Sequence, residues 1–287
     1  MNAVSWTWID GTLSPGPEAR VAAADRGLHY GDGVFETLRA ERGRAFLLDA
    51  HLERMRAGLG VLGIAVGGVV GRAREGTAAV AARLAEEDAA TIKIMVTRGV
   101  GPGGPSCGSA LVPTVIAIGR ADAPERPDSM RAVTSSVVRN ERSPLARVKS
   151  LNYLEMVLAR REAEAAGVEE ALMMNTQGRL AEAAAANVFA VVDGRLVTPP
   201  VSEGCLPGIV RTEVMRIAEA SGIRVRQTPM PPEMLGEASE AFLTNSRIGI
   251  VPLVEIDGRL LGAGPVAARL RGAFHEVELA SAGGDAA

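Results

Sequence analysis

The succession of short strand patterns, tight turns and helix patterns is what most limits the fold of this 287-residue chain. Five segments within the first 119 residues are rich in β-branched, aromatic or aliphatic residues and are bounded by turn residues, which predicts antiparallel strands. These segments are residues 6–13, 34–40, 45–48, 91–99 and 112–119. Apolar residues at helical spacing predict helices over 49–63, with Asp49 as the N-cap, and over 69–85.

Residues 120–130 combine Pro with charged residues, a composition typical of a linker. Beyond them, strand patterns return at 132–139, 170–175, 187–194 and 240–258. Helices are expected over 150–167 and over 209–222. We therefore expect an α/β (α+β) chain of two domains, a small one over 1–119 and a larger one over 131–287.

Composition argues against several kinds of partner and site. The net charge is −3 with both signs mixed along the chain, so no basic block predicts nucleic-acid binding. We expect no membrane span and no signal peptide, because the chain lacks a long apolar run, and we expect a cytoplasmic protein. Cys107 and Cys205 predict neither a disulfide framework nor a metal site. His29, His51 and His275 are too far apart in sequence to predict a metal cluster.

The chain has 29 arginines but only two lysines, Lys93 and Lys149. Arginine cannot replace lysine as an amine nucleophile because its guanidinium stays protonated. Lys149, in RVKSLNYLEMVLA, is either such a nucleophile or an ordinary solvated lysine near a helix start. Lys93 alternates with Ile92 and Ile94, so its side chain is expected on the opposite side of a strand, and it is the poorer candidate.

Glu182 lies in RLAEAAAANVFAVVDG, a stretch made mostly of small and apolar residues. Its carboxylate is either exposed in a turn or buried against a partner, because an unpaired buried charge is costly. The protonated ring nitrogen of a bound cofactor is one such partner.

A helix beginning near Ile209 follows the loop GCLPG, and the free amides at a helix N-terminus suit a phosphate group. Arg54 can add a charge-assisted contact to such a phosphate, or it is an ordinary exposed helix arginine. Thr244–Ser246 offers further donors after a strand. His51 is more typical of a packed or capping histidine than of a catalytic one.

Seven ordered motifs give the chain a specific resemblance that runs nearly from end to end. They are ADRGLHYGDGVFETLR, HLERMR, TRG, VKSLNYLEMVLARREA, AEAAAANVFAVVDG, LPGIVR and LTNSRIGIVPL. In these motifs the chain resembles the class IV aminotransferase family, the fold-type IV pyridoxal-phosphate enzymes. The resemblance implies two domains, of which the larger binds the cofactor, and it implies a homodimer.

The resemblance also implies a role for each matching residue. Lys149 would form the aldimine with pyridoxal 5′-phosphate and move the proton between Cα and C4′, while Glu182 would pair with the pyridine nitrogen. Tyr153, or else Asn152, would contact the ring hydroxyl. The full cofactor-binding set is Arg54, Lys149, Tyr153, Glu182, Asn187, Leu206, Gly208, Ile209, Val210, Asn245 and Ser246. The substrate-binding set is Tyr30, Phe35 and Arg98.

The same resemblance leaves more than one reaction open for a small-molecule substrate. FETLR, KSLNYLE and LTNSRIGIVPL favour the lyase that converts 4-amino-4-deoxychorismate into 4-aminobenzoate and pyruvate for folate synthesis. The alternative is an aminotransferase using a D-amino acid, a branched-chain amino acid or an (R)-amine. Thr37 would be catalytic in the lyase as a proton relay, or it is a β-branched strand residue.

The loop after TRG departs from both patterns. D-amino-acid enzymes of the family carry an Arg and a His there and lyases an Arg-Gly-Tyr sequence, whereas this chain has VGPGGPSC, with Gly103 and Pro105. A third alternative is a cofactor-binding protein without activity, against which the presence of both Lys149 and Glu182 argues.

Overall fold

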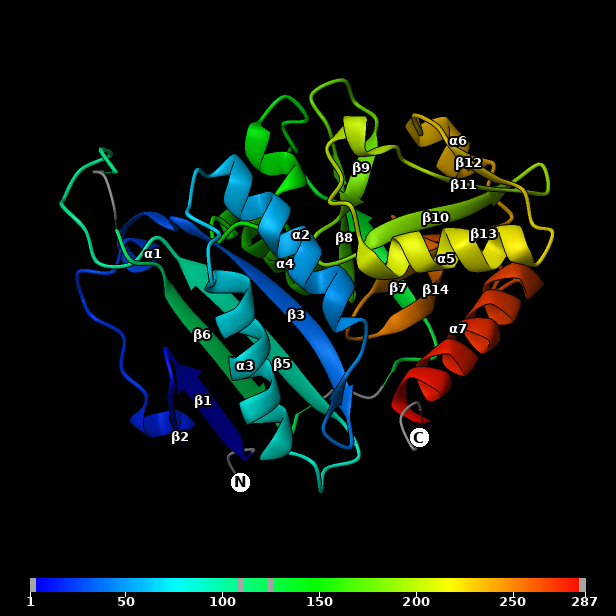
Figure 1. Ribbon diagram of the computed structural model, residues 1–287. Coiled ribbons are helices and arrows are strands. Elements are labelled where there is room, and N and C mark those ends of the chain that lie inside the picture. The colour runs from blue at the N-terminus through cyan, green and yellow to red at the C-terminus, as the bar shows by residue number, and fades with distance from the viewer. Residues whose placement is uncertain (1–3, 108–110, 123–125, 284–287) are drawn as a thin grey trace. The chain divides into compact units, whose positions relative to one another are not determined.

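The computed structural model describes residues 4–107, 111–122 and 126–283 (Figure 1). The chain divides into two compact units, which we call unit 1 and unit 2. Unit 1 consists of Met1–Pro124, Val148–Asn152 and Ser281–Ala287. Unit 2 consists of Glu125–Arg147 and Tyr153–Ala280. Both combine strands and helices, which confirms the expected mixed α/β class. The boundary at residue 124 falls within the predicted linker, part of which lies outside the described residues.

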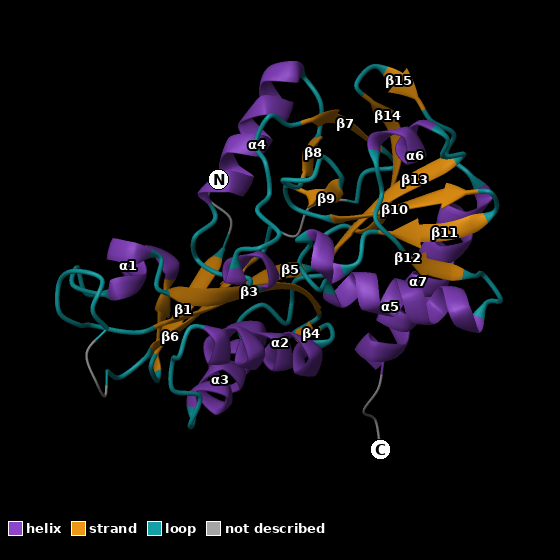
Figure 2. Cartoon of the chain, turned by 90° about the horizontal axis from the view of Figure 1, so that it is seen from above, coloured by secondary structure: helices purple, strands orange, loops and turns teal. Residues whose placement is uncertain are grey.

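Unit 1 contains a six-stranded antiparallel sheet with the order β2-β1-β6-β5-β3-β4. Its strands are β1 (Ser5–Ile9), β2 (Thr12–Pro15), β3 (Gly33–Glu41), β4 (Arg44–Ala45), β5 (Ala90–Thr97) and β6 (Thr114–Arg120). Its helices are α1 (Arg26–Tyr30), α2 (Leu48–Val61) and α3 (Val69–Ala82), with a 3₁₀ turn at Gly16–Glu18. In both ribbon views, α2 and α3 lie on the same face of this sheet (Figures 1 and 2).

Strand alternation fills the layer between that sheet face and the helices. Val34, Leu38, Ile92 and Ile94 are at most 1% exposed and form one core with apolar residues of α2 and α3. The predicted orientation of Lys93 is confirmed, because it lies between two fully buried isoleucines and is itself only half-buried.

Two predicted helix starts were wrong. Asp49 is not the N-cap of α2, because the helix begins at Leu48 and follows Leu47, which has a φ of 51° and forms no side-chain cap. The predicted 150–167 helix begins only at Leu154. The residues before it pair with β3 instead, since Phe35 N donates to Lys149 O (2.8 Å) and Leu151 N donates to Gly33 O (3.0 Å).

Unit 2 contains a nine-stranded mixed sheet with the order β12-β11-β10-β13-β14-β7-β8-β9 and with β15 paired to β14. Its strands are β7 (Met130–Thr134), β8 (Glu170–Met174), β9 (Leu180–Ala183), β10 (Asn187–Val192), β11 (Arg195–Thr198), β12 (Val225–Gln227), β13 (Glu240–Asn245), β14 (Gly249–Ile256) and β15 (Arg259–Leu260). Its helices are α4 (Leu154–Ala166), α5 (Ile209–Ala220), α6 (Pro232–Gly236) and α7 (Pro265–Gly283), with 3₁₀ turns at Pro144–Arg147 and Val201–Glu203. Helix α4 packs on β7 and β8, while α5 packs on β12 and β13.

The core of unit 2 is built around its central strands. Phe189 on β10 and Phe242 on β13 are fully buried neighbours whose rings stack at 5.0 Å between centroids. The sequence patterns did not predict α1, α6 or α7, nor the short strands β9, β11 and β12.

Two glycines of α3 provide a matched test of this packing. A Cβ at Gly76 would lie 2.5 Å from Cε3 of Trp8, whose side chain is 3% exposed and cannot move aside, whereas a Cβ at Gly71 would meet nothing within 4 Å. We expect Gly76→Ala to lower the free energy of unfolding by about 1–3 kcal/mol. Gly71→Ala should raise it by about 0.5 kcal/mol through helix propensity. Urea unfolding of both variants measures this, and equal effects would contradict the packing described.

Candidate active site

Lys149 is held on unit 1 by its own backbone. Its carbonyl accepts from Phe35 N, and the flanking Val148 and Ser150 are 6% and 4% exposed. Its half-buried side chain places Nζ 4.5 Å from the centroid of the Phe35 ring. The backbone of Lys149 is therefore fixed and its side chain packs on a ring, while its role as the nucleophile stays a prediction.

The second lysine of the chain contacts the same ring. Lys93 Nζ lies 4.7 Å from the Phe35 centroid, and its pKa is lowered by burial and by the positive charge of Arg120. Thr37 lies opposite Lys93 in the β3–β5 register and is half-buried. The structure therefore brings the predicted residues Phe35, Thr37 and Lys149 to one part of unit 1.

The opposite face of β3 carries a buried carboxylate that sequence reasoning missed. Glu36 is fully buried, and its Oε1 accepts from Arg54 Nε (2.8 Å) while Oε2 accepts from Arg54 Nη2 (2.5 Å) and from His51 Nδ1 (2.7 Å). Burial by itself raises the pKa of this carboxyl, but the charge and hydrogen bonds of Arg54 and His51 lower it to about 2. The signal was available, because strand alternation places Glu36 on the same core-facing side as Val34 and Leu38.

The same contacts decide two alternatives on α2. The side chain of Arg54 is only 11% exposed, so the exposed-helix interpretation was wrong, and its predicted phosphate contact stays a prediction. His51 is 1% exposed and donates to Glu36, which confirms a packed histidine. Burial is the main cause that lowers the pKa of His51, and the charges of Arg54 and Lys149 lower it further.

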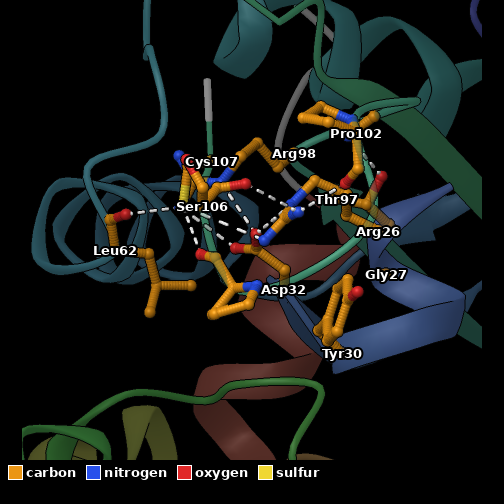
Figure 3. A network of polar contacts seen from close by, with 12 residues as sticks. Arg26, Gly27, Tyr30, Asp32, Leu62, Thr97, Arg98, Pro102, Ser106 and Cys107 are labelled. Atoms are coloured by element: carbon orange, nitrogen blue, oxygen red, sulfur yellow. Dashed lines mark hydrogen bonds and ion pairs between the residues drawn. The ribbon is translucent and has the colours of Figure 1, made fainter. Parts of the chain in front are cut away.

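Figure 3 shows a third polar network of unit 1, to which two of the predicted substrate residues belong. Arg98 donates from Nε and Nη2 to Asp32 (2.8 and 3.0 Å) and also to the carbonyls of Leu62 and Gly63 (2.7 and 3.0 Å). These bonds favour a structural role, and the predicted substrate contact of Arg98 stays a prediction. Tyr30 lies on α1, where it is 40% exposed. The pKa of Asp32 is lowered, because hydrogen bonds and charges of Arg98 and Arg26 outweigh the opposing effect of burial.

In unit 2, Glu182 lies on β9 and is 5% exposed, so the exposed-turn alternative was wrong. Its Oε2 accepts from Leu206 N (2.9 Å), and its Oε1 lies 3.3 Å from Arg139 Nε. Arg139, which sequence reasoning did not single out, also donates to the carbonyls of Gly204 and Ala146. A buried carboxylate held this way fits a protonated ring nitrogen as an additional partner.

The start of α5 fits a phosphate group. Gly208 is the N-cap and provides no side-chain cap for the first amides of the helix, which belong to Ile209 and Val210. A Cβ at Gly208 would lie 1.9 Å from Asn187 Oδ1, so a side chain at this position would displace Asn187. Asn187 Nδ2 in turn donates to Leu206 O (2.9 Å). Uncapped amides at the positive end of a 12-residue helix favour an anion.

The other predicted cofactor contacts of unit 2 lie on β10, at the end of β13 and at the start of α4. Asn187 is opposite Thr244, whose buried hydroxyl forms no hydrogen bond in the described part of the chain. Asn245 Oδ1 accepts from the amides of Arg247 and Ile248, which shapes the turn that also holds the half-buried Ser246. Tyr153 occupies the N-cap position of α4.

Cys107 and Cys205 are both free thiols in this structure. Burial first, and then the charge of Glu182, raises the pKa of the Cys205 thiol to about 12. In the described ranges, no three His, Cys, Asp or Glu side chains gather as a possible metal site. None of the helices in that part of the chain has the length and apolar character of a membrane span.

Glu36 gives a pH-dependent prediction. Its pKa is about 2 when folded against 4.5 for an ordinary glutamate, so its stabilisation is present above pH 4.5 and is lost as the pH falls toward 2. Below pH 4.5, the free energy of unfolding should fall with decreasing pH less steeply in Glu36→Gln than in the wild type. The two slopes should differ by about 1.4 kcal/mol per pH unit. Urea unfolding between pH 6 and about pH 3 measures the two slopes. Glu53→Gln, at a position 73% exposed on α2, is the control, and identical slopes for all three proteins would contradict the prediction.

Comparison with known proteins identifies the family. A model described as Amino-transferase class IV matches residues 33–256. The branched-chain-amino-acid aminotransferase of Pseudomonas aeruginosa is 31% identical over 94% of this chain and 92% of that protein. The crystal structure of 4-amino-4-deoxychorismate lyase from the same organism has a TM-score of 0.85 and 32% identity, over 94% of this chain and 98% of that one. A T.th. branched-chain aminotransferase with pyridoxamine 5′-phosphate has a TM-score of 0.83 and 28% identity, over 96% and 94% of the chains. The chain belongs to the class IV aminotransferase family, whose members are pyridoxal-phosphate enzymes.

Proposed function

We propose that the protein is a pyridoxal-phosphate aminotransferase in which Lys149 is the amine that binds the cofactor and moves the substrate proton. When bound, the cofactor supplies a ring that withdraws electrons from the substrate Cα. Glu182 keeps the ring nitrogen protonated, because a buried carboxylate is stabilised by a cationic partner. The amides of Ile209 and Val210, with Arg54, Asn245 and Ser246, hold the phosphate.

One observation carries the proposal. The backbone of Lys149 is fixed to β3 by the hydrogen bond from Phe35 N, while its Nζ rests against the Phe35 ring at 4.5 Å. Because the backbone is fixed and the side chain is flexible, the Lys149 amine can take up a proton at one atom and release it at another while the backbone stays in place. Membership of an enzyme family speaks against a binding protein without activity.

Transamination is the first candidate reaction because the relatives reported above include two branched-chain aminotransferases. The sequence VGPGGPSC in the loop after Arg98 has no side chain that could grip a carboxylate by charge. We therefore leave the amino donor open among branched-chain amino acids, D-amino acids and (R)-amines.

The second candidate is the lyase that forms 4-aminobenzoate and pyruvate from 4-amino-4-deoxychorismate. Elimination of pyruvate requires a proton donor besides Lys149, and Thr37 offers a hydroxyl two residues from Phe35 on the same strand face. The 32% identity to a lyase of known structure also supports this candidate.

The low lysine content makes the cofactor test unambiguous. Borohydride reduction of the cofactor-loaded protein, followed by peptide mass spectrometry, should place the cofactor on Lys149. Lys93→Gln should keep this attachment, whereas Lys149→Gln should lose it together with activity, by about 10²–10⁴-fold. A cofactor found on Lys93, or a protein that binds none, would reject the proposal.

Products separate the two reactions. The loaded enzyme is given amino donors with pyruvate or 2-oxoglutarate, and separately 4-amino-4-deoxychorismate. Conversion of the cofactor spectrum by a donor, with keto-acid release, supports the aminotransferase. Release of 4-aminobenzoate and pyruvate, lowered in Thr37→Val but not in Thr91→Val on β5, supports the lyase. Thr91→Val is a matched β-branched control on the neighbouring strand.

We also propose a homodimer, since apolar side chains are exposed on helix α4. Leu154, Val157 and Leu158 are 75%, 47% and 49% exposed and recur at helical spacing. Replacing Leu154 and Leu158 by Glu should shift the protein from dimer to monomer in sedimentation velocity. Leu260→Glu on β15, at a position 78% exposed, is the control. A wild-type monomer, or a dimer in the double variant, would refute an interface on α4.

A further inference from the structure

Arg26 is the first residue of α1 and is 3% exposed. Its Nη1 donates to the carbonyls of Pro102 (3.0 Å), Gly104 (3.0 Å) and Ser106 (3.2 Å), three alternate residues of one loop (Figure 3). Its Nη2 lies 3.9 Å from Cys107 Sγ. One guanidinium thus binds three carbonyls of the 102–106 segment, which we call the carbonyl loop.

The guanidinium is itself held in place. Arg26 Nε donates to Asp32 Oδ2 (2.9 Å), an oxygen that also accepts from Arg98 Nε. The Arg26 backbone amide donates to Gly99 O (3.0 Å), and the preceding Asp25 caps α1 through Gly27 N (2.7 Å). The backbone and the guanidinium of Arg26 are therefore both held by contacts outside the carbonyl loop.

Tyr30 adds a second anchor at the other end of α1. Its ring lies under the Arg26 guanidinium at 4.7 Å, and its hydroxyl accepts from Gly104 N (2.5 Å). A Cβ at Gly101 would meet Arg26 Cδ at 2.9 Å, so the chain enters the loop pressed against the arginine stem. Arg26 and Tyr30 together bind both the amide and the carbonyl of Gly104.

The same helix touches the segment that carries Lys149. Asn152 Nδ2 donates to Gly31 O (3.0 Å), at the C-cap of α1, and Leu151 N donates to Gly33 O (3.0 Å). Helix α1 therefore contacts the carbonyl loop through Arg26 and Tyr30, and its C-cap residue Gly31 contacts the Lys149 segment through Asn152.

We propose that Arg26 is a positioning residue that fixes the carbonyl loop and thereby sets the substrate selectivity of the enzyme. The loop sequence PGGPS has no charged side chain, and its two adjacent glycines leave the backbone between Pro102 and Pro105 many conformations, which the contacts of Arg26 and Tyr30 restrict. Arginine is required because lysine, a single ammonium on a flexible stem, cannot serve Asp32 and three carbonyls at once. The selectivity part rests on the proposed function.

The test uses Arg26→Lys and Tyr30→Phe in the full chain, with Arg56→Lys as the control. Arg56 is 56% exposed and contacts Glu53 on the surface of α2. Hydrogen exchange of the 100–107 segment should be at least about 10-fold faster in Arg26→Lys, and in Tyr30→Phe it should be faster at Gly104, whose amide loses its acceptor. The ratio of kcat/KM between a small and a bulky amino donor should change by about 10-fold or more in Arg26→Lys. The control should change neither quantity.

Unchanged exchange in Arg26→Lys would overturn the positioning role, and faster exchange with an unchanged donor ratio would overturn the role in selectivity. If Arg26→Lys does not fold, hydrogen exchange at Gly104 in Tyr30→Phe decides whether α1 fixes the loop, since this variant removes the hydroxyl that accepts from Gly104. Failure of the proposed function is distinguishable, because it would appear as absent cofactor attachment in the wild type while the exchange measurement remains readable.

Discussion

The hydrogen bonds between β3 and residues 148–152 determine where the chemistry of this chain is placed. Phe35 N and Leu151 N each donate across this contact, and the pairing keeps Lys149 out of the helix that follows it. If the helix had begun at Ser150, Lys149 would lie at a helix terminus, and the direction of its side chain would depend on the orientation of that helix. Beside β3 its backbone is fixed by the hydrogen bond from Phe35 N, while its amine lies against the Phe35 ring.

Carboxylates removed from solvent impose a second constraint, and three of those discussed here meet it by pairing with arginine. Glu36 is paired with Arg54. Asp32 is paired with Arg26 and Arg98. Glu182 is paired with Arg139. Removing one partner from such a pair leaves an uncompensated buried charge, which costs about 3–5 kcal/mol. The planar guanidinium can serve a carboxylate and carbonyls together, as Arg98 does with Asp32, Leu62 and Gly63. Both lysines of the chain lie against the Phe35 ring.

The features of unit 2 that suit a phosphate and a ring nitrogen depend largely on backbone. Leu206 uses its amide to hold Glu182 and its carbonyl to hold Asn187, whatever its side chain is. Gly208 contributes the absence of a Cβ. Such roles tolerate changes in neighbouring side chains, which explains how a family can keep one cofactor while its substrates differ.

Sequence by itself determined the mixed α/β class, the orientation of Lys93 and the family, because strand alternation and ordered motifs are local signals. It also identified Lys149 and Glu182 as the residues to examine. Only the tertiary structure decided that Glu182 is buried and that Lys149 lies beside β3, because both depend on partners more than 20 residues away in the chain, Leu206 and Phe35. The role of Arg139 was hidden for the same reason, because Glu182 and Gly204 are distant from it in sequence. Arg26 has Asp32 close by in the chain, but the loop carbonyls that it binds are distant. Strand alternation could have shown that Glu36 is buried, whereas its pairing with Arg54 and His51 depends on how α2 packs on β3.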